Sequence, residues 1–511
     1  MKLNRTSIQN PAEWQGYSLP GFEVAPMVER TKKEPVWLHM GAGNIFRVFP
    51  AVMHQELLEA KLIDRGITVC ECYDEEIVPT IFTPHDNLTL AVTLKADGTT
   101  DKKVVASMAE AITASSQKAR LMEICAAPSL QMISFTITEK GYKVLDPLNR
   151  ESMMGYVTDG LLARYKAGAY PLALVSMDNC SQNGAVLKAA VKSVAEAWVK
   201  EGWADSGFVQ YIDSLAFPWS MIDKITPRPS AEVAAMLKDT GYEDAEVVTT
   251  TKGTWISSFV AAEECQYLVI EDDFPNGRPP LEKAGLLFAD RETVERVEKM
   301  KVCTCLNPLH TVLAISGCLL GYKTIAETMG NPHLVALVKE IAYVESMPVV
   351  TDPKIIDPKS FLSDVLEKRF NNPFIGDAPQ RIAMDTSQKI PVRFGETLKL
   401  RREAGLSEEE LKGIPFFIAL WLRYLMGLND QGEPMPVESD PRAAELTAHF
   451  VGLSLGDAGP YNLAPILTDT TIFGIDLYAG DGILGKKVET FFAELIKGPG
   501  AISRNLAKMW N

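Results

Sequence analysis

The chain has 511 residues, which is more than one hydrophobic core usually supports, so two domains are expected. Hydrophobic residues make up 46% of the chain and charged residues 23%, which is ordinary for a globular protein. With 51 basic and 66 acidic side chains, the formal charge of −15 argues against nucleic acid or an anionic membrane as a partner.

The sequence predicts a cytoplasmic protein. Its first residues, MKLNRTSIQNPAEWQGY, have no apolar core of the kind that a secretory signal peptide needs. We expect no apolar run to approach the ~20 residues of a membrane-spanning helix. The eight cysteines do not follow a disulfide framework, and Cys70/Cys72 and Cys303/Cys305 lack the second cluster of a zinc site. We therefore expect reduced thiols and no bound metal.

A dinucleotide-binding unit is indicated near the amino end. Residues 36–40, VWLHM, predict a buried strand that runs directly into GAGNIFR (41–47), and helical spacing follows to residue 60. Glycines let the backbone turn tightly beside a pyrophosphate, whose charge the next helix N-terminus favours. The third glycine of the full fingerprint is absent, so a plain strand-to-helix turn stays open. The expected cofactor contacts here are Gly41, Gly43, Asn44, Ile45 and Arg47.

The second expected strand, residues 66–71, ends in an acid. A carboxylate at Glu71 would accept the adenosine ribose hydroxyls and disfavour a 2′-phosphate, so NAD is the expected cofactor. Asp74 is the next choice. Strands are also expected at 131–137 and 171–177, followed by Thr138-Glu139 and Asp178-Asn179. Open α/β sheets bind ligands at the carboxyl ends of such strands, although Asp178 and Asn179 also suit turns and helix caps.

The character of the chain changes near residue 290. Another strand is expected at 266–273, after which long helical patterns dominate: 294–321, 331–346, 358–370, 408–428, 440–453 and 485–508. The predicted architecture is an α/β Rossmann-type dinucleotide-binding domain, residues 1–290, and a mostly α-helical substrate and catalytic domain, residues 291–511.

Within the second domain, residues 301–322 (KVCTCLNPLHTVLAISGCLLGY) predict a buried helix that carries polar groups. Lys301, Asn307 and His310 stand among Val, Leu, Ile, Ala and Cys. Polar side chains are unfavourable there unless they are paired or used. A lone histidine on such a helix is most often a core residue, but the combination with lysine, asparagine and a nucleotide signal favours a catalytic site.

Five blocks of the sequence resemble the polyol-specific long-chain dehydrogenase family, also called the mannitol dehydrogenase family. GAGNIFR (41–47) is similar to its G-x-G-x-F-H-R, with Phe46 in place of the family's histidine. The others are TITEKGY (136–142), SMDNCSQNG (176–184), PWSMIDKITP (218–227) and KVCTCLNPLH (301–310), the last similar to K-x-x-x-x-N-x-x-H. The match extends over residues 36–395, and the blocks follow the family order.

The resemblance implies an NAD-dependent, metal-independent oxidoreductase with a lysine base. Lys301 would take the hydroxyl proton, and burial favours the neutral amine that a base requires. Asn179 and Asn307 would donate to the developing alkoxide. His310 would hold a substrate hydroxyl, and Asp223 would contact the substrate or orient Lys301.

The spacing of the last block departs from the family. Five residues separate Lys301 from Asn307, where the family has four. At about 100° per residue, a regular helix would place Lys301 and His310 on opposite faces instead of about 80° apart. A one-residue π-bulge near Thr304, one turn before Pro308, would absorb the extra residue. Without a bulge, Lys299 or another lysine would have to serve as the base.

Two further blocks, IEDDFPNGRP (270–279) and DTSQKIP (385–391), most resemble the hexuronate-reducing branch of the family. A sugar acid brings a carboxylate, so the segment 381–393 is expected to bind it, through Lys389 first and then Arg381 and Arg393. Branches that act on mannitol or on tagaturonate stay open, as does a nucleotide-sensing protein without catalysis. The expected partner is a small sugar acid or polyol, and the oligomeric state is left open.

Overall fold

The computed structural model describes residues 1–510 and divides into two compact units, Met1–Glu295 and Arg296–Asn511. The first unit is built on β-sheet and the second on helices. Every strand in the described part of the chain ends before residue 290.

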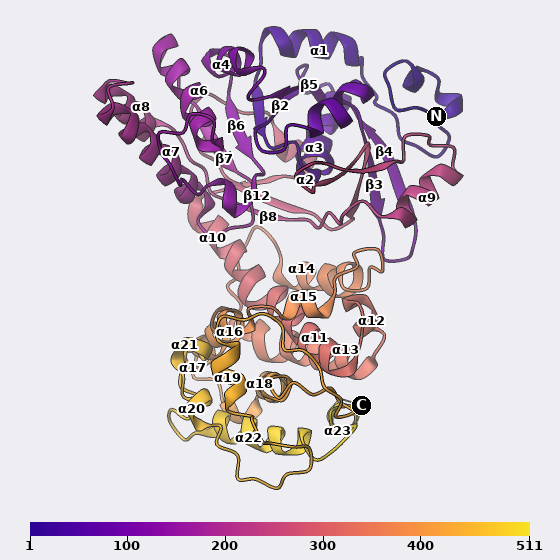
Figure 1. Cartoon of the computed structure of the whole chain (residues 1–511), viewed down its shortest axis with the longest axis vertical. Helices are drawn as coiled ribbons and strands as arrows, with labels where there is room; N and C mark the ends of the chain where they lie inside the picture. The colour runs from indigo at the N-terminus through magenta and orange to yellow at the C-terminus, as the bar shows by residue number, and fades with distance from the viewer. Residues whose placement is uncertain (511) are drawn as a thin grey trace. The chain divides into compact units, whose positions relative to one another are not determined.

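A five-stranded parallel sheet forms the centre of the first unit, in the order β5-β2-β1-β6-β7 (Figure 1). All residues of β1, β2, β6 and β7 are buried, which explains why each is a short apolar run in the sequence. Successive side chains enter two different cores, Trp37 one and Leu38 the other. The strands are β1 (Trp37–Met40), β2 (Ile67–Glu71), β5 (Met108–Thr113), β6 (Met132–Phe135) and β7 (Ala173–Ser176).

The strand order creates a switch point between β1 and β6. The chain leaves β1 toward β2 and β5, then crosses to β6 and β7 on the other side. Ligands of such sheets bind in the crevice at the carboxyl ends of the two strands that flank the switch. The sequence predicted β1, β2, β6 and β7, and the Rossmann-type order confirms the fold class. The helices of this unit are α1 (Val24–Lys33), α2 (Asn44–Val48), α3 (Pro50–Glu59), α4 (Lys118–Ala126), α5 (Thr138–Gly141), α6 (Met153–Gly168), α7 (Asn183–Lys200), α8 (Ser206–Ser214) and α9 (Ala231–Asp239).

Three smaller sheets complete the first unit, and the sequence predicted only β12 among their strands. The orders are β11-β3-β4, β13-β12-β8 and the hairpin β10-β9. Their bounds are β3 (Thr89–Leu94), β4 (Thr100–Val105), β8 (Ser220–Asp223), β9 (Val247–Thr249), β10 (Trp255–Ser257), β11 (Phe259–Glu263), β12 (Tyr267–Glu271) and β13 (Leu287–Ala289).

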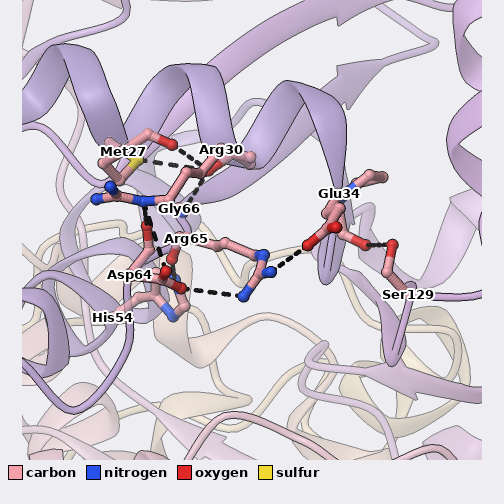
Figure 2. Close-up of polar contacts among 10 residues, drawn as sticks. Met27, Arg30, Glu34, His54, Asp64, Arg65, Gly66 and Ser129 are labelled. Atoms are coloured by element: carbon pink, nitrogen blue, oxygen red, sulfur yellow. Dashed lines mark hydrogen bonds and ion pairs between the residues drawn. The ribbon is translucent and has the colours of Figure 1, made fainter.

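Polar contacts fasten α1 to the segment that enters β2, as Figure 2 shows. The Gly66 N–H donates to Thr31 Oγ1 at 2.7 Å, and the Arg65 guanidinium pairs with Glu34. The His54 Nε2–H donates to the Arg65 carbonyl oxygen at 2.8 Å. Buried backbone groups need such partners, and these bonds hold α1 and α3 against the start of β2.

The second unit is helical. Its centre includes α11, which is buried over most of its length, and α18, whose 12 residues are all buried. The Glu345 carboxylate accepts the N–H groups of Gly413 and Ile414 at the start of α18, at 2.6 and 2.7 Å. The helices are α10 (Arg291–Met300), which begins in the first unit, α11 (Asn307–Leu320), α12 (Ile325–Met329), α13 (Pro332–Lys339), α14 (Pro358–Asp364), α15 (Pro379–Ala383), α16 (Thr386–Ile390), α17 (Glu396–Glu403), α18 (Gly413–Tyr424), α19 (Ala443–Ala448), α20 (Ala464–Leu467), α21 (Thr470–Phe473), α22 (Ile483–Leu495) and α23 (Ala501–Met509).

Several helices contain a wider π-turn. These are η3 (Val78–Phe82) in the first unit and η6 (Lys301–Cys305), η7 (Glu340–Ser346), η9 (Val365–Arg369) and η10 (Pro391–Gly395) in the second. π-turns are rare and favour functional sites. Two of these turns contain residues that the sequence singled out, Lys301 and Arg393.

One helical stretch, Arg291–Leu320, is long and apolar enough to cross a membrane, with a mean hydropathy of 1.5 in its most apolar window. This differs from our expectation that no apolar run would approach that length. Since 83% of that window is buried within the structure, the stretch also fits the core helix of a soluble protein, and its length and composition are weak evidence for a membrane span.

Candidate active site

The glycine turn lies at the switch point of the sheet. Gly41 follows β1 with φ of +103°, and a Cβ there would lie 2.5 Å from the Thr136 carbonyl oxygen after β6. Only glycine tolerates both conditions. A Cβ at Gly43 would meet nothing within 4 Å, and Asn44 and Ile45 then begin α2. The turn thus packs closely against the segment after β6 and leaves open space in front of α2. This geometry fits a dinucleotide pyrophosphate.

Arg47 does not belong to this turn, contrary to the prediction. Its side chain is 1% exposed. Its guanidinium donates to Thr89 Oγ1 at 2.9 Å and to the carbonyl oxygens of Ser257 and Ser258 at 2.9 and 3.2 Å. Burial lowers the pKa of Arg47 to about 9. Arg47 therefore ties α2 to β3 and to the junction of β10 and β11. The guanidinium has a structural role, which corrects the predicted cofactor contact.

Glu71 ends β2, but its carboxylate turns inward. Oε2 accepts the Ala42 N–H of the glycine turn at 2.7 Å. Oε1 accepts the N–H groups of Cys72, Tyr73 and Asp74 at 3.1, 2.8 and 3.1 Å. Four of the contacts that a carboxylate can accept are therefore made by backbone N–H groups. Glu71 joins the glycine turn to the segment after β2, and its contact with the ribose hydroxyls stays a prediction.

The next three carboxylates along the chain are also engaged. Asp74, the second choice for the ribose, is 3% exposed and accepts the Thr250 hydroxyl at 2.7 Å. Glu76 accepts the Thr251 N–H at 2.9 Å. Glu75 accepts the Ser115 N–H at 2.7 Å and borders a cavity of about 430 Å³ at the carboxyl ends of β2 and β5. The rest of the lining includes Val78, Pro79, Thr83, Thr113, Ser116 and Gln117. A cavity on this side of the switch point suits the adenosine half of a dinucleotide.

Thr138 and Glu139 lie across the switch point from the glycine turn, after β6. Thr138 has φ of +63°, which is unusual for a β-branched residue. The Asp178 carboxylate holds it there by accepting the N–H groups of Ile137 and Thr138, both at 2.9 Å, and the Tyr142 hydroxyl at 2.6 Å. Burial raises the pKa values of both Asp178 and Tyr142. A strained backbone such as that of Thr138, held in place by neighbouring groups, is typical of functional sites.

Asn179 and Asp223 belong to two segments that Asn183 locks together. The Asn183 amide donates to the carbonyl oxygens of Asp178 and Ser220, both at 3.0 Å, and accepts the Ser220 N–H at 3.0 Å. A Cβ at Gly184 would lie 2.4 Å from the Phe217 carbonyl oxygen, so the two segments need glycine to meet. Asn179 is exposed on the loop after β7, and Asp223 is the buried last residue of β8.

The predicted π-bulge before Asn307 is confirmed. Lys301–Cys305 form a π-turn in which the Leu306 N–H donates to the Lys301 carbonyl oxygen at 3.1 Å, five residues back. Leu306 then breaks the helix with φ of −127° and ψ of −65°, and Pro308 lies in the first turn of α11. The turn takes up the extra residue that separates this block from the family spacing. Lys301 is 3% exposed, as expected for a buried base.

His310 is surrounded by cations. Burial lowers its pKa to about 3, and Arg393, Arg369, Arg381 and Lys389 act in the same direction. The imidazole is therefore neutral. Its Nε2 makes no hydrogen bond within the described structure, although Asp377 Oδ2 lies 3.5 Å away. A neutral histidine with a free ring nitrogen can bind a substrate hydroxyl.

The three cations predicted to bind a carboxylate all lie in this region. Arg393 donates to the Asn307 carbonyl oxygen at 3.2 Å and to the Thr311 hydroxyl, which ties it to α11. Lys389 is half-buried, and its ammonium donates to the carbonyl oxygens of Ile382, at 3.0 Å, and Met384. Burial lowers the pKa of Lys389 to about 8, and Arg393 adds to this effect.

Arg381 is 65% exposed in its side chain and pairs with Asp377. Asp377 thus stands between Arg381 and His310, a position that sequence reasoning missed. Sequence reasoning also missed Arg369, in η9, and the locking residue Asn183, and it named Asp178 without its hold on Thr138. The signal for Asp377 was its place four residues before Arg381, a spacing that pairs side chains on a helix. Asp178 and Asn183 stood inside a matched block, but their partners are distant in sequence.

The sequence matches known families along most of its length. The mannitol dehydrogenase Rossmann domain matches residues 36–283, and the mannitol dehydrogenase C-terminal domain matches residues 293–494. This chain belongs to the mannitol dehydrogenase family. The resemblance found in the sequence is thereby confirmed.

Among curated relatives, the D-mannonate oxidoreductase of Thermotoga maritima is 45% identical, and the alignment covers 100% of this chain and 99% of that protein. Two solved structures share the fold at 24% identity. D-sorbitol dehydrogenase in substrate-free form has a TM-score of 0.81 over 98% of this chain and 99% of its own. The Pseudomonas fluorescens mannitol 2-dehydrogenase ternary complex with NAD and D-mannitol has a TM-score of 0.70 over the full length of both chains.

Proposed function

We propose that the protein is an NAD-dependent oxidoreductase that interconverts D-mannonate and D-fructuronate. The observation that carries the proposal is the 45% identity to a D-mannonate oxidoreductase over essentially the whole of both chains. The solved relatives are named for sorbitol and mannitol, but at 24% identity they bear only on the fold.

The first unit would bind NAD. Gly41 and Gly43 would receive the pyrophosphate, Asn44 and Ile45 would offer the first N–H groups of α2, and the exposed Glu139 and strained Thr138 would face them from β6. A family relative is described as a ternary complex with NAD. NAD, when bound, accepts the hydride from the substrate carbon or returns it.

The proton would be handled by this chain's own residues. Lys301 would take the proton of the reacting hydroxyl as the general base. Asn179 and Asn307 would donate to the developing alkoxide, which is stabilising only where the donors are already oriented. Arg393 supports that orientation by binding the Asn307 carbonyl oxygen. The neutral His310 would hold a neighbouring hydroxyl, and Asp223 would contact the substrate or orient Lys301.

A sugar acid also needs a partner for its carboxylate. Lys389, Arg381 and Arg393 would supply the positive charge, and Lys389 ranks first because its ammonium is half-buried with one N–H beyond its two carbonyl partners. Burial keeps His310 neutral, and the same cations, together with Arg369, lower its pKa further. One cluster would therefore serve both the carboxylate and the hydroxyl of a single substrate.

The compartment and partners follow from the same proposal. All eight cysteines are free thiols, which fits the reducing cytoplasm. The partner would be a small sugar acid, and no oligomeric state is assigned.

The test is oxidation with NAD or NADP of D-mannonate, D-altronate and D-mannitol, followed by absorbance of the reduced cofactor. We expect D-mannonate with NAD to give the highest kcat/KM, at least tenfold above NADP, because four carboxylates lie in the segment from Glu71 to Glu76 and oppose a 2′-phosphate. Preference for D-altronate would indicate a tagaturonate reductase, and preference for D-mannitol a mannitol 2-dehydrogenase. Cofactor binding without any turnover would indicate a nucleotide sensor.

A further inference from the structure

The segment after β2 presents an aromatic ring to solvent at the edge where ligands bind. Tyr73 is 68% exposed, although it stands two residues beyond the buried Glu71. An exposed tyrosine is unremarkable on most surfaces, but the carboxyl end of the second strand of a Rossmann-type sheet is the adenosine side of the crevice.

The backbone of Tyr73 is held in place by the Glu71 carboxylate. Its N–H donates to Glu71 Oε1 at 2.8 Å, and the same carboxylate accepts the Ala42 N–H of the glycine turn. The position of the Tyr73 backbone is thus linked directly to the turn expected to receive the pyrophosphate.

The ring of Tyr73 is backed by a cation from a distant segment. The Lys252 ammonium lies 4.4 Å from the ring centroid and donates to the Tyr73 carbonyl oxygen. Lys252 stands at the tip of the β9–β10 hairpin. Asp74 and Glu76 pin that tip by binding Thr250 and Thr251, at 2.7 and 2.9 Å.

This arrangement covers one face of the ring with a cation and leaves most of the side chain open. We propose that Tyr73 is the stacking platform for the adenine of the dinucleotide, with Lys252 as the residue that positions it. The inference rests on the proposed use of NAD. The free ring face would take the adenine, and the cavity that begins at Glu75, two residues on, lies beside the same strand end.

The platform also explains the use of the acids after β2. Glu71, Asp74 and Glu76 each bond a backbone or hairpin group that fixes either Tyr73 or Lys252. Their charges still oppose a 2′-phosphate, while their hydrogen bonds build the platform.

The experiment compares Tyr73→Ala, Tyr73→Phe and Lys252→Met with the unmodified full-length protein. AMP, which carries the adenosine without the nicotinamide, is titrated as a competitor of NADH fluorescence. Aromatic stacking on a base is worth enough that Tyr73→Ala should weaken AMP and NADH binding about tenfold or more. Lys252→Met should weaken both by roughly two- to fivefold, the range of an exposed cation–π contact. Tyr73→Phe keeps the aromatic ring and should bind both nucleotides normally.

Trp203→Ala is the matched control. Trp203 is 41% exposed and has the Arg150 guanidinium 5.6 Å from its ring, but it follows the far end of α7, away from the carboxyl ends of the strands. It should bind AMP normally. Binding of AMP by Tyr73→Ala within twofold of the unmodified protein would overturn the platform. Normal AMP and NADH binding without turnover of any sugar acid would instead overturn the proposed function and leave the platform standing, whereas an unmodified protein that binds neither nucleotide would overturn both.

Discussion

Lys301 is a buried amine in a widened helical turn. A second lysine nearby, Lys299, offers a control for its role. Lys299, two residues earlier, is 41% exposed in its side chain and pairs with Glu396 at 2.5 Å. The sequence could name both lysines but could choose between them only through the spacing to Asn307. Because the π-turn takes up the extra residue before Asn307, we propose Lys301 and not Lys299 as the base.

Lys301→Ala should lower kcat by roughly 10²–10⁴, the usual range for loss of an acid–base group, while substrate and cofactor still bind. Added primary amines should restore part of the rate. Lys299→Ala, the control, should keep near-normal kcat. Steady-state kinetics in both directions checks this, and a Lys301→Ala enzyme with near-normal kcat would exclude Lys301 as the base.

Lys389→Met should raise KM for D-fructuronate by one to two orders of magnitude and hardly change KM for D-fructose, which has no carboxylate. The reason is the loss of a charge-assisted contact worth about 1.5–3 kcal/mol. With its pKa lowered to about 8, Lys389 is charged below that pH, so KM for D-fructuronate in the unmodified enzyme should rise above pH 8.

The substitution should remove that pH dependence as well. Lys354→Met is the control, because Lys354 is 78% exposed in its side chain and pairs with nearby Asp352. Equal loss of affinity for D-fructuronate and D-fructose in Lys389→Met would point to a structural role in holding the segment 382–384.

At the scale of elements, periodicity predicted the buried strands and the long helices but not their breaks. Residues 485–508 were expected as one helix, and this was wrong: α22 ends at Leu495 and α23 begins at Ala501, with Gly498 and Gly500 at positive φ between them. β5 was missed because Glu110 and Ala111 interrupt its apolar pattern. The π-turn η6 was the one break that the sequence predicted, because five residues separate Lys301 from Asn307 where the family has four.

Deleting Val302 from η6 should be tolerated, because it restores the four-residue spacing between Lys301 and Asn307 in a regular helix. Inserting one alanine at the same place should rotate Lys301 by about 100° from His310. We expect kcat within about tenfold of normal for the deletion and a loss like that of Lys301→Ala for the insertion. Circular dichroism would confirm that both variants fold. A folded deletion variant as inactive as Lys301→Ala would contradict the account of the π-turn.

At the scale of the whole molecule, the fold class and the family could be predicted from the sequence, while the interior polar network could not. Arg47 matched a family block and was assigned to the cofactor, but its partners Thr89 and Ser257 are 42 and 210 residues away. Glu71 ends the expected strand, but only the structure shows that its carboxylate accepts backbone N–H groups from two segments. Local patterns carry no record of such distant partners.

The same network should make the protein sensitive to acid. Burial lowers the pKa of His39 to about 3, of His54 to about 4 and of His310 to about 3, against about 6.5 in an unfolded chain. Below pH 6.5 these histidines therefore bind protons in the unfolded chain but stay neutral in the folded protein. Each histidine should remove up to about 1.4 kcal/mol of stability per pH unit between about pH 6.5 and its folded pKa.

Urea unfolding at pH 7.5, 6 and 5 measures this effect. His54, which donates to the Arg65 carbonyl oxygen in the cluster of Figure 2, offers a control. His54→Gln can keep that bond and should reduce the pH dependence of the unfolding midpoint. Equal midpoints for the unmodified protein at pH 7.5 and 5 would contradict the burial of neutral histidines.

The most direct test of the central claim is the rate of NADH oxidation with D-fructuronate against that with D-fructose, using the unmodified protein. We expect a kcat/KM for D-fructuronate at least a hundredfold higher, a difference of roughly 2.7 kcal/mol. Only the sugar acid would engage the cluster of Lys389, Arg381 and Arg393 beside His310. The product should be D-mannonate. Equal or faster reduction of D-fructose would contradict the account and identify a mannitol 2-dehydrogenase.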